Sequence, residues 1–185
     1  MLGASLSAIL SKNHSVYCSG NSTVSFLENY MSFDLANYSY KKLISWSKPE
    51  IIVHCAALTD GNYCDKNINE AFEINSFSLN KFIEFTNNDV RIIYISTDAV
   101  FSPKVINPSE LTNTSAKSIY GKSKELGEFF LLNSNRDVNI IRTTIVGINK
   151  NRKRNTKGLL DWIIFSVKNN IKINLYNDVV FNPIS

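Results

Sequence analysis

The segment VRIIYISTDAVF, residues 90–101, carries the pattern that decides the fold. Its first half, VRIIYI, is a nearly continuous apolar run, which is typical of a strand covered on both faces of a sheet. Three small polar residues follow at once, namely Ser96, Thr97 and Asp98. In open parallel sheets, ligands bind outside the carboxyl ends of the strands. The segment therefore predicts both a buried parallel strand and a ligand site at its end.

Similar apolar runs recur along the chain and alternate with amphipathic stretches. The expected strands span residues 14–18, 50–57, 90–97, 138–147 and 171–178. The expected helices span residues 2–11, 39–46, 69–86, 119–132 and 156–167. Strands that alternate with helices pair in parallel through right-handed crossovers. The predicted fold class is therefore α/β, with an open, doubly wound parallel sheet.

The composition is that of an ordinary globular domain of 185 residues with a net charge of +4. This mild charge predicts no nucleic-acid partner. No apolar stretch reaches the roughly 18–20 residues that span a bilayer, and no signal peptide opens the chain. The three cysteines Cys18, Cys55 and Cys64 show no metal-type pairing, so we expect reduced thiols, no metal and a cytoplasmic location.

The chain opens with MLGASLSAIL, which predicts an amphipathic helix containing one glycine, Gly3. A dinucleotide site in such a sheet needs a first strand and a glycine-rich turn before this helix. We therefore expect the first strand to be missing from this chain, as in a fragment or a mis-started gene product. Losing about five buried aliphatic residues removes roughly 8–15 kcal/mol of burial, against a typical total stability of about 5–15 kcal/mol. Alone, the chain is expected to fold poorly and to bind dinucleotide weakly or not at all.

Tyr120 and Lys124 stand in YGKSK, at the start of the expected helix 119–132. Positions i and i+4 share one helix face, so the phenol and the ammonium can lie side by side. A neighbouring ammonium favours the phenolate, which predicts a lowered pKa for Tyr120 and a role as general acid. The alternative for an isolated Tyr-x-x-x-Lys is a surface pair on an amphipathic helix.

Several further motifs follow in a fixed order. They read CAALTD at 55–60, EIN at 73–75, STDAVF at 96–101, YGKSKELGE at 120–128, IIRTTIVG at 140–147 and NDVVFNPIS at 177–185. With these motifs the chain resembles the extended short-chain dehydrogenase/reductases, and in particular the dTDP-4-dehydrorhamnose reductases, truncated at both ends. The resemblance implies a Rossmann-like fold. It also implies that residues 1–185 are a fragment of a single dinucleotide-binding domain, with the start of a substrate-binding region at about 148–185.

The resemblance implies roles for individual residues. Tyr120 would be the general acid, Lys124 would hold the nicotinamide ribose, and Thr97 would donate a hydrogen bond to the substrate oxygen. Ser96 is the alternative to Thr97, or else a strand-end cap. Substrate contacts are implied at Thr97, Asp98 and Ile145. Cofactor contacts are implied at Met1, Leu2, Gly3, Asp34, Leu35, Ala56, Ala57, Leu58, Asn75, Tyr120 and Lys124.

Asn75 is either an amide that hydrogen-bonds strand backbone near the nicotinamide or a plain helix-surface asparagine. No acidic residue follows the expected strand 14–18, which favours NADP over NAD, although NAD stays open. Ala99 and Ile145 stand where the family commonly has tyrosine and tryptophan, so the rhamnose precursor is one candidate sugar among others.

The implied activity is NAD(P)H-dependent reduction of a nucleotide-activated 4-keto-deoxysugar in polysaccharide precursor synthesis, such as dTDP-rhamnose biosynthesis. Two alternatives stay open. One is a sugar-nucleotide epimerase that uses the same Tyr–Lys pair. The other is a silent binding subunit such as the regulatory subunit of methionine adenosyltransferase. The expected partners are a sugar nucleotide and a second copy in a homodimer, with no nucleic acid and no membrane.

Overall fold

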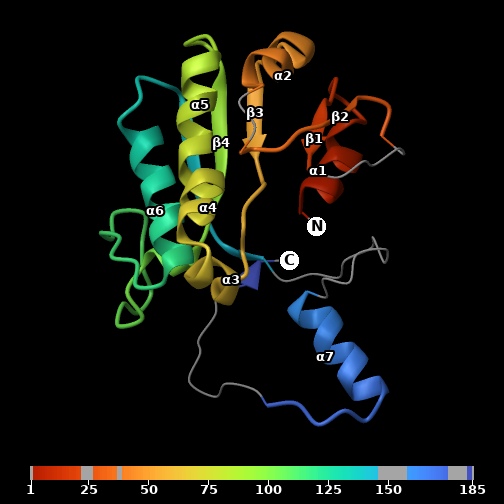
Figure 1. Cartoon of the computed structure of the whole chain (residues 1–185), viewed down its shortest axis with the longest axis vertical. Helices are drawn as coiled ribbons and strands as arrows, with labels where there is room; N and C mark the ends of the chain where they lie inside the picture. Colours follow the sequence, from red (N-terminus) through yellow and green to blue (C-terminus); the bar gives the residue numbers. More distant parts are fainter. Residues whose placement is uncertain (1, 22–26, 37–38, 146–157, 175–182, 185) are drawn as a thin grey trace.

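The chain folds as an α/β protein whose paired strands are parallel (Figure 1). The structure is a computed structural model, and it describes residues 2–21, 27–36, 39–145, 158–174 and 183–184. The strands are β1 Cys18–Gly20, β2 Tyr30–Ser32, β3 Ile51–His54, β4 Arg91–Ser96, β5 Val138–Arg142, β6 Thr144–Ile145 and β7 Pro183–Ile184. The α-helices are α1 Leu2–Leu10, α2 Tyr40–Ser47, α3 Gly61–Lys66, α4 Ile68–Phe72, α5 Ser78–Phe85, α6 Ile119–Leu132 and α7 Leu159–Lys168. A π-helix, η1 Glu73–Phe77, joins α4 to α5, and a 3₁₀ turn, η2 Asp98–Val100, follows β4. The predicted α/β class with a parallel sheet is confirmed.

The main sheet has the order β3-β4-β5, and α4, α5 and α6 pack along one side of β4 (Figure 1). Side chains alternate along β4, because successive residues of a strand point to opposite faces. Ile92 and Tyr94 face the helices and are fully buried against Leu79 of α5 and Leu131 of α6. This cluster is the core that fixes α6 relative to the end of β4.

The opposite face of this sheet is only partly covered among the described residues. Ile51 of β3 is 53% exposed and Ile141 of β5 is 41% exposed. The apolar runs predicted burial on both faces, and this prediction is wrong for the second face of β3-β4-β5.

Strands β1 and β2 form a separate parallel pair (Figure 1). Within the described ranges, no strand is hydrogen-bonded to the second edge of β1 or of β3. In Figure 1, β1 lies between β2 and β3. The expected first strand would have these two edges as its neighbours, and its absence from the chain stays a prediction. Helix α1 begins beside the carboxyl end of β3, since a Cβ at Gly3 would lie 3.7 Å from the Cβ of Cys55.

Side-chain packing around Tyr40 links the small sheet to the main one. Tyr40 is fully buried, and its ring contacts Phe33 and Phe82 edge-on, with 5.0 Å between ring centroids in each pair. Its hydroxyl donates to the Leu35 carbonyl at 2.7 Å. Since Phe33 follows β2 and Phe82 lies on α5, this cluster holds the two sheets together where backbone pairing does not.

Helix α6 has the predicted bounds, but four expected elements differ from the structure. Residues 14–18 were expected to be a strand, yet the His14 amide donates to Leu10 and closes the end of α1, so β1 begins at Cys18. The expected helix 69–86 contains the π-helix η1. The expected strand 138–147 is interrupted at Thr143, between β5 and β6, and its residues 146–147 lie outside the described residues.

The expected strand 171–178 is also wrong where the structure describes it. Residues 171–174 have no regular structure, and 175–178 lie outside the described residues. Asn170 has φ 52°, and the amide of Ile171 donates to the Ser166 carbonyl at 2.9 Å. This is a Schellman-type end to α7. The amide of Ile171 therefore closes the helix and is not free to pair with a neighbouring strand.

Strands β2 and β7 and helix α3 are additional to the predicted elements. The two strands are three and two residues long, and they carry no aliphatic run. Helix α3 starts at Asp60, whose carboxylate accepts from the Tyr63 amide at 3.0 Å. Cys18, Cys55 and Cys64 are free thiols, as predicted. Within the described part of the chain, no helix is long and apolar enough to cross a bilayer.

Gly127→Ala tests the packing of α6 on η1. A Cβ at Gly127 would lie 2.7 Å from Leu79 Cδ1 and 2.8 Å from both the Asn75 carbonyl oxygen and the Tyr94 hydroxyl. We expect the free energy of unfolding to fall by about 1–3 kcal/mol, because an overpacked core must shift. The matched control is Gly61→Ala, where nothing lies within 4 Å of the added Cβ. Equal stability of the two variants in urea unfolding would contradict this account.

A strand added to the N-terminus tests the unpaired edges of β1 and β3. We expect a five-residue Val/Ile strand with a two-glycine turn, fused before Met1, to raise the free energy of unfolding. The gain should be several kcal/mol, since about 0.8 kcal/mol is gained for each CH₂ group buried. The control extension has the same length, with Ser and Asn in place of Val and Ile. Equal melting temperatures for the two extensions would show that no added strand pairs with the free edges of β1 and β3.

Candidate active site

The site begins where β4 ends, at Thr97. The Thr97 side chain is 5% exposed, and its Oγ1 accepts from the Ala99 amide at 3.2 Å. This contact caps η2 and fixes the Thr97 rotamer next to the strand tip. Tyr120 lies close enough to this hydroxyl for Thr97 to lower the pKa of its phenol. Thr97 therefore joins the end of the sheet to α6.

Tyr120 reaches Thr97 because the start of α6 packs tightly against the η2 turn. Ser118 caps the helix, and its Oγ accepts from the Gly121 amide at 3.0 Å. A Cβ at Gly121 would lie 2.3 Å from the Ala99 carbonyl oxygen, so only glycine permits this approach. The glycine after Tyr120 thus sets how close the phenol comes to the strand tip.

Lys124 lies one helical turn after Tyr120 and is almost fully buried, at 1% exposure. Its Nζ donates to the Ile95 carbonyl at 2.8 Å and lies 4.0 Å from the centroid of the Tyr94 ring. Burial lowers the pKa of Lys124 to about 7, while Glu128 and Cys55 act in the opposite direction. Near neutral pH the amine therefore exists in both protonation states.

The pKa of Tyr120 is raised in the structure, contrary to the expected lowering. Burial is the main cause, and the nearby Asp98 also raises the pKa, whereas the Thr97 hydrogen bond lowers it. Lys124 does not supply the expected stabilisation of the phenolate, because its amine bonds to Ile95 and is itself easily deprotonated. Tyr120 is consequently a protonated phenol at neutral pH.

Asn75 ties the segment after β3 to α6. Its Oδ1 accepts from the Leu58 amide at 2.8 Å, and its Nδ2 donates to the Leu58 carbonyl at 3.0 Å and to Ser123 Oγ at 2.9 Å. Asn75 is fully buried in η1, so it is not a helix-surface asparagine. The expected backbone contact exists, although it falls on the loop after β3 and not on the strand itself.

A second polar group lies beyond Thr97. Asp98 Oδ1 accepts from Thr97 at 3.2 Å, and Asp98 Oδ2 accepts a short hydrogen bond from Thr144. Ile145 follows Thr144 in the half-buried strand β6. The predicted substrate residues Thr97, Asp98 and Ile145 are thus brought to one end of the sheet.

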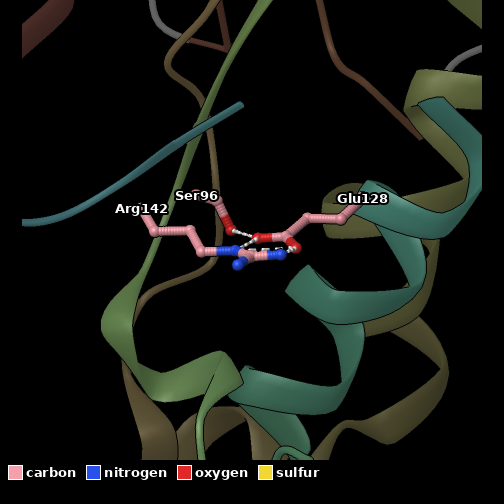
Figure 2. A network of polar contacts seen from close by, with 3 residues as sticks. All are labelled: Ser96, Glu128 and Arg142. Carbon is pink, nitrogen blue, oxygen red and sulfur yellow. Dashed lines mark hydrogen bonds and ion pairs between the residues drawn. The ribbon is translucent and has the colours of Figure 1, made fainter. Parts of the chain in front are cut away.

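Ser96 takes a different direction from Thr97. Its hydroxyl donates to Glu128 of α6, whose carboxylate also accepts from Arg142 of β5 (Figure 2). This geometry favours Thr97 over Ser96 as the residue that faces a ligand. Glu128 and Arg142 are not among the predicted site residues, although Glu128 stands four residues after Lys124 on the same helix face.

The remaining predicted cofactor residues lie at the same sheet end or beside the small sheet. Leu2 and Gly3 open α1 near Cys55, while Ala56 is exposed and Ala57 half-buried after β3. Asp34 is exposed and accepts from the Ala36 amide at 3.0 Å, and Leu35 packs against the Tyr40 cluster. Met1 lies outside the described residues.

Parallel strands with Thr97, Tyr120 and Lys124 at their carboxyl ends define the chain as an extended short-chain dehydrogenase/reductase. More narrowly, it belongs to the RmlD substrate binding domain family, which it matches over residues 1–184. The predicted family resemblance is confirmed.

Two curated relatives match part of the chain. The spore coat polysaccharide biosynthesis protein SpsK of Bacillus subtilis is 38% identical over 101 residues, which cover 54% of this chain and 36% of SpsK. The dTDP-4-dehydrorhamnose reductase of Sinorhizobium fredii is 35% identical over 118 residues, which cover 62% of this chain and 40% of that enzyme. The matched region therefore spans well under half of either relative.

One solved structure combines this fold with a bound nucleotide. It is the dTDP-4-dehydrorhamnose reductase of Bacillus anthracis in complex with NADP, with a TM-score of 0.66 and 26% identity. The match covers 76% of this chain and 51% of that protein.

Lys124→Met tests the buried amine through the pH dependence of stability. The pKa of Lys124 is about 7 when folded and 10.5 in the reference state, so the unfolded chain binds more protons between these values. The wild type should therefore gain stability with rising pH relative to the variant, by about 1–2 kcal/mol between pH 7.0 and 8.5. Lys122→Met, at an exposed position, controls for the loss of one positive charge. The same pH dependence in both variants would contradict the assignment.

Proposed function

We propose that the protein containing this chain reduces the 4-keto group of a nucleotide-activated deoxysugar, with NADPH as the hydride source. The observation that carries the proposal is the placement of Tyr120 and the buried Lys124, one helical turn apart on α6, against Thr97 at the carboxyl end of β4. Ligands bind at this end of open α/β sheets. The relatives' names, a polysaccharide biosynthesis protein and a dTDP-4-dehydrorhamnose reductase, point to the same substrate class.

Tyr120 would act as the general acid. Reduction of a ketone leaves an alkoxide, which must take up a proton as it forms. The raised pKa of Tyr120 keeps the proton on its oxygen until a stronger base develops nearby. The proton would then pass from Tyr120 Oη to the sugar oxygen, while the Thr97 hydroxyl would turn away from Asp98 and donate its hydrogen bond to the same oxygen. A protonated Lys124 would stabilise the tyrosinate that remains.

The residues at the sheet end fit a dinucleotide, which when bound supplies the hydride. Gly3, Ala56 and Ala57 are small, and their backbone lies at the carboxyl end of β3 and the start of α1. Asn75 holds the Leu58 backbone in place beside them. Small side chains let a cofactor lie against the backbone, and helix N-termini favour phosphate groups.

The substrate would lie beyond Thr97, near Asp98 and Ile145. Asp98 is held by Thr97 and Thr144, so its carboxylate is fixed for hydrogen bonds to sugar hydroxyls. Ala99 and Ile145 offer no aromatic ring to stack on the sugar or base. We therefore extend the proposal to the class of 4-keto-deoxysugar nucleotides, of which dTDP-4-dehydrorhamnose is the first to test.

Tyr120→Phe tests the proposal, with NADPH oxidation followed by absorbance in the presence of dTDP-4-dehydrorhamnose. We expect turnover to fall by about 10²–10⁴-fold, because the proton donor is lost. The affinity for NADPH should stay within a few-fold, since the ring remains. The assays use this chain as it stands and the chain with an N-terminal strand fused.

Tyr63→Phe is the control, since Tyr63 is exposed and donates to Glu70 at 2.8 Å on the surface. Unchanged turnover in Tyr120→Phe would remove Tyr120 from its role. NADPH binding without any reduction by either form of the wild type would favour a silent binding subunit.

A further inference from the structure

Three polar side chains share one face of α6 and point at the end of β4. Tyr120, Lys124 and Glu128 are spaced four residues apart, which places them one above the other on a helix. Of these three side chains, the proposed reaction uses only Tyr120 and Lys124. Glu128 is 2% exposed, and a carboxylate buried to this degree is costly unless it is paired.

Glu128 spans two neighbouring strands at once (Figure 2). Ser96 ends β4 and pairs in register with Arg142, the last residue of β5. Arg142 reaches the carboxylate through Nε at 3.1 Å and Nη2 at 2.8 Å, and Ser96 donates a short hydrogen bond to Oε1. The carboxylate therefore fixes α6 to both strands at the level where the active site begins.

This attachment acts directly on the site because of the order of residues in the chain. The Ile95 carbonyl accepts from Lys124, and Thr97 lies against Tyr120. Ser96 lies between these two residues and is held by Glu128. Any sliding of α6 along β4 would disturb the three contacts together.

Glu128 is also the carboxylate that acts most strongly on Lys124. The groups around the amine are Tyr120 and Glu128 on α6, His54 and Cys55 at the end of β3, and Tyr94 on β4. His54 is neutral because burial lowers its pKa to about 3, and burial raises the pKa values of Cys55 and Tyr94. Glu128 opposes the effect of burial on the amine and raises the pKa of Lys124.

We propose that Glu128 is a positioning residue of the active site. Its carboxylate, held by Ser96 and Arg142, locks the Tyr120–Lys124 face of α6 onto the tip of β4 and favours the ammonium form of Lys124. The catalytic consequence rests on the proposed reductase function, whereas the effect on Lys124 does not.

The test is Glu128→Gln, which keeps the side-chain shape and removes the charge. The lysine Cε–Hε signals of the uniformly ¹³C-labelled protein report the titration of Lys124 directly by NMR. We expect the titration midpoint of Lys124 to fall by about one pH unit in the variant, the usual minimum effect of losing a nearby opposite charge. If turnover changes with pH because Lys124 loses its proton, the pH at which this change occurs should fall by the same amount.

Two controls separate charge from packing. Ser96→Ala removes a hydrogen bond but leaves the carboxylate, so the Lys124 midpoint should stay within about 0.3 pH unit. Glu84→Gln, at an exposed surface ion pair with Lys81, should change neither the midpoint nor the profile. If Glu128→Gln does not fold, the double variant Glu128→Leu/Arg142→Leu replaces the buried ion pair with apolar residues and is titrated in the same way.

An unchanged Lys124 midpoint in Glu128→Gln overturns the proposal, whatever the activity. A lowered midpoint in a protein whose wild type shows no reductase activity leaves the effect of Glu128 on Lys124 standing and rejects the proposed function instead.

Discussion

The close packing of α6 on the end of β4 is the constraint on which the site depends. Gly121 and Gly127 remove the side chains that would keep the helix away from Ala99 and from η1. The bond from Lys124 to Ile95 and the bonds from Glu128 to β4 and β5 then fix the helix along and across the sheet. With the helix held in this way, Tyr120 lies against Thr97.

The fold class, helix α6 and the position of Thr97 could be predicted because each has a local signal in the sequence. Helix α6 combines a serine cap at Ser118 with a regular apolar face, and Thr97 follows an unmistakable strand. The electrostatics of Tyr120 could not be predicted, because they depend on burial and on the Ile95 carbonyl, which is distant in sequence. The short strands β2 and β7 carry no aliphatic run, so no hydrophobic pattern in the sequence predicted them. Glu128 was visible as a charge on the helix face that carries Tyr120 and Lys124, but its partners come from two other elements.

The two parts of the sheet are held by different forces. Hydrogen-bonded ladders unite β3, β4 and β5, whereas the β1-β2 pair is attached through aromatic packing around Tyr40. The residues implied in the nicotinamide end of the site lie on the first part, and Asp34 and Leu35, implied at the adenine, lie on the second. Aromatic packing between α2, β2 and α5 therefore decides whether the two halves of a dinucleotide site face each other.

The π-helix η1 fixes the length of the chain between α4 and α5. A π turn holds one residue more than an α turn in the same rise, so it behaves as a single insertion in a longer helix. Removing one residue from η1 would restore regular α geometry without rotating α5, whereas removing one residue from the regular helix α4 would rotate everything beyond it by about 100°. Asn75 would then leave Leu58, and Leu79 would leave the core. Single insertions and deletions in α4 therefore rotate the residues of η1 and α5 away from their partners, even where the altered position faces solvent.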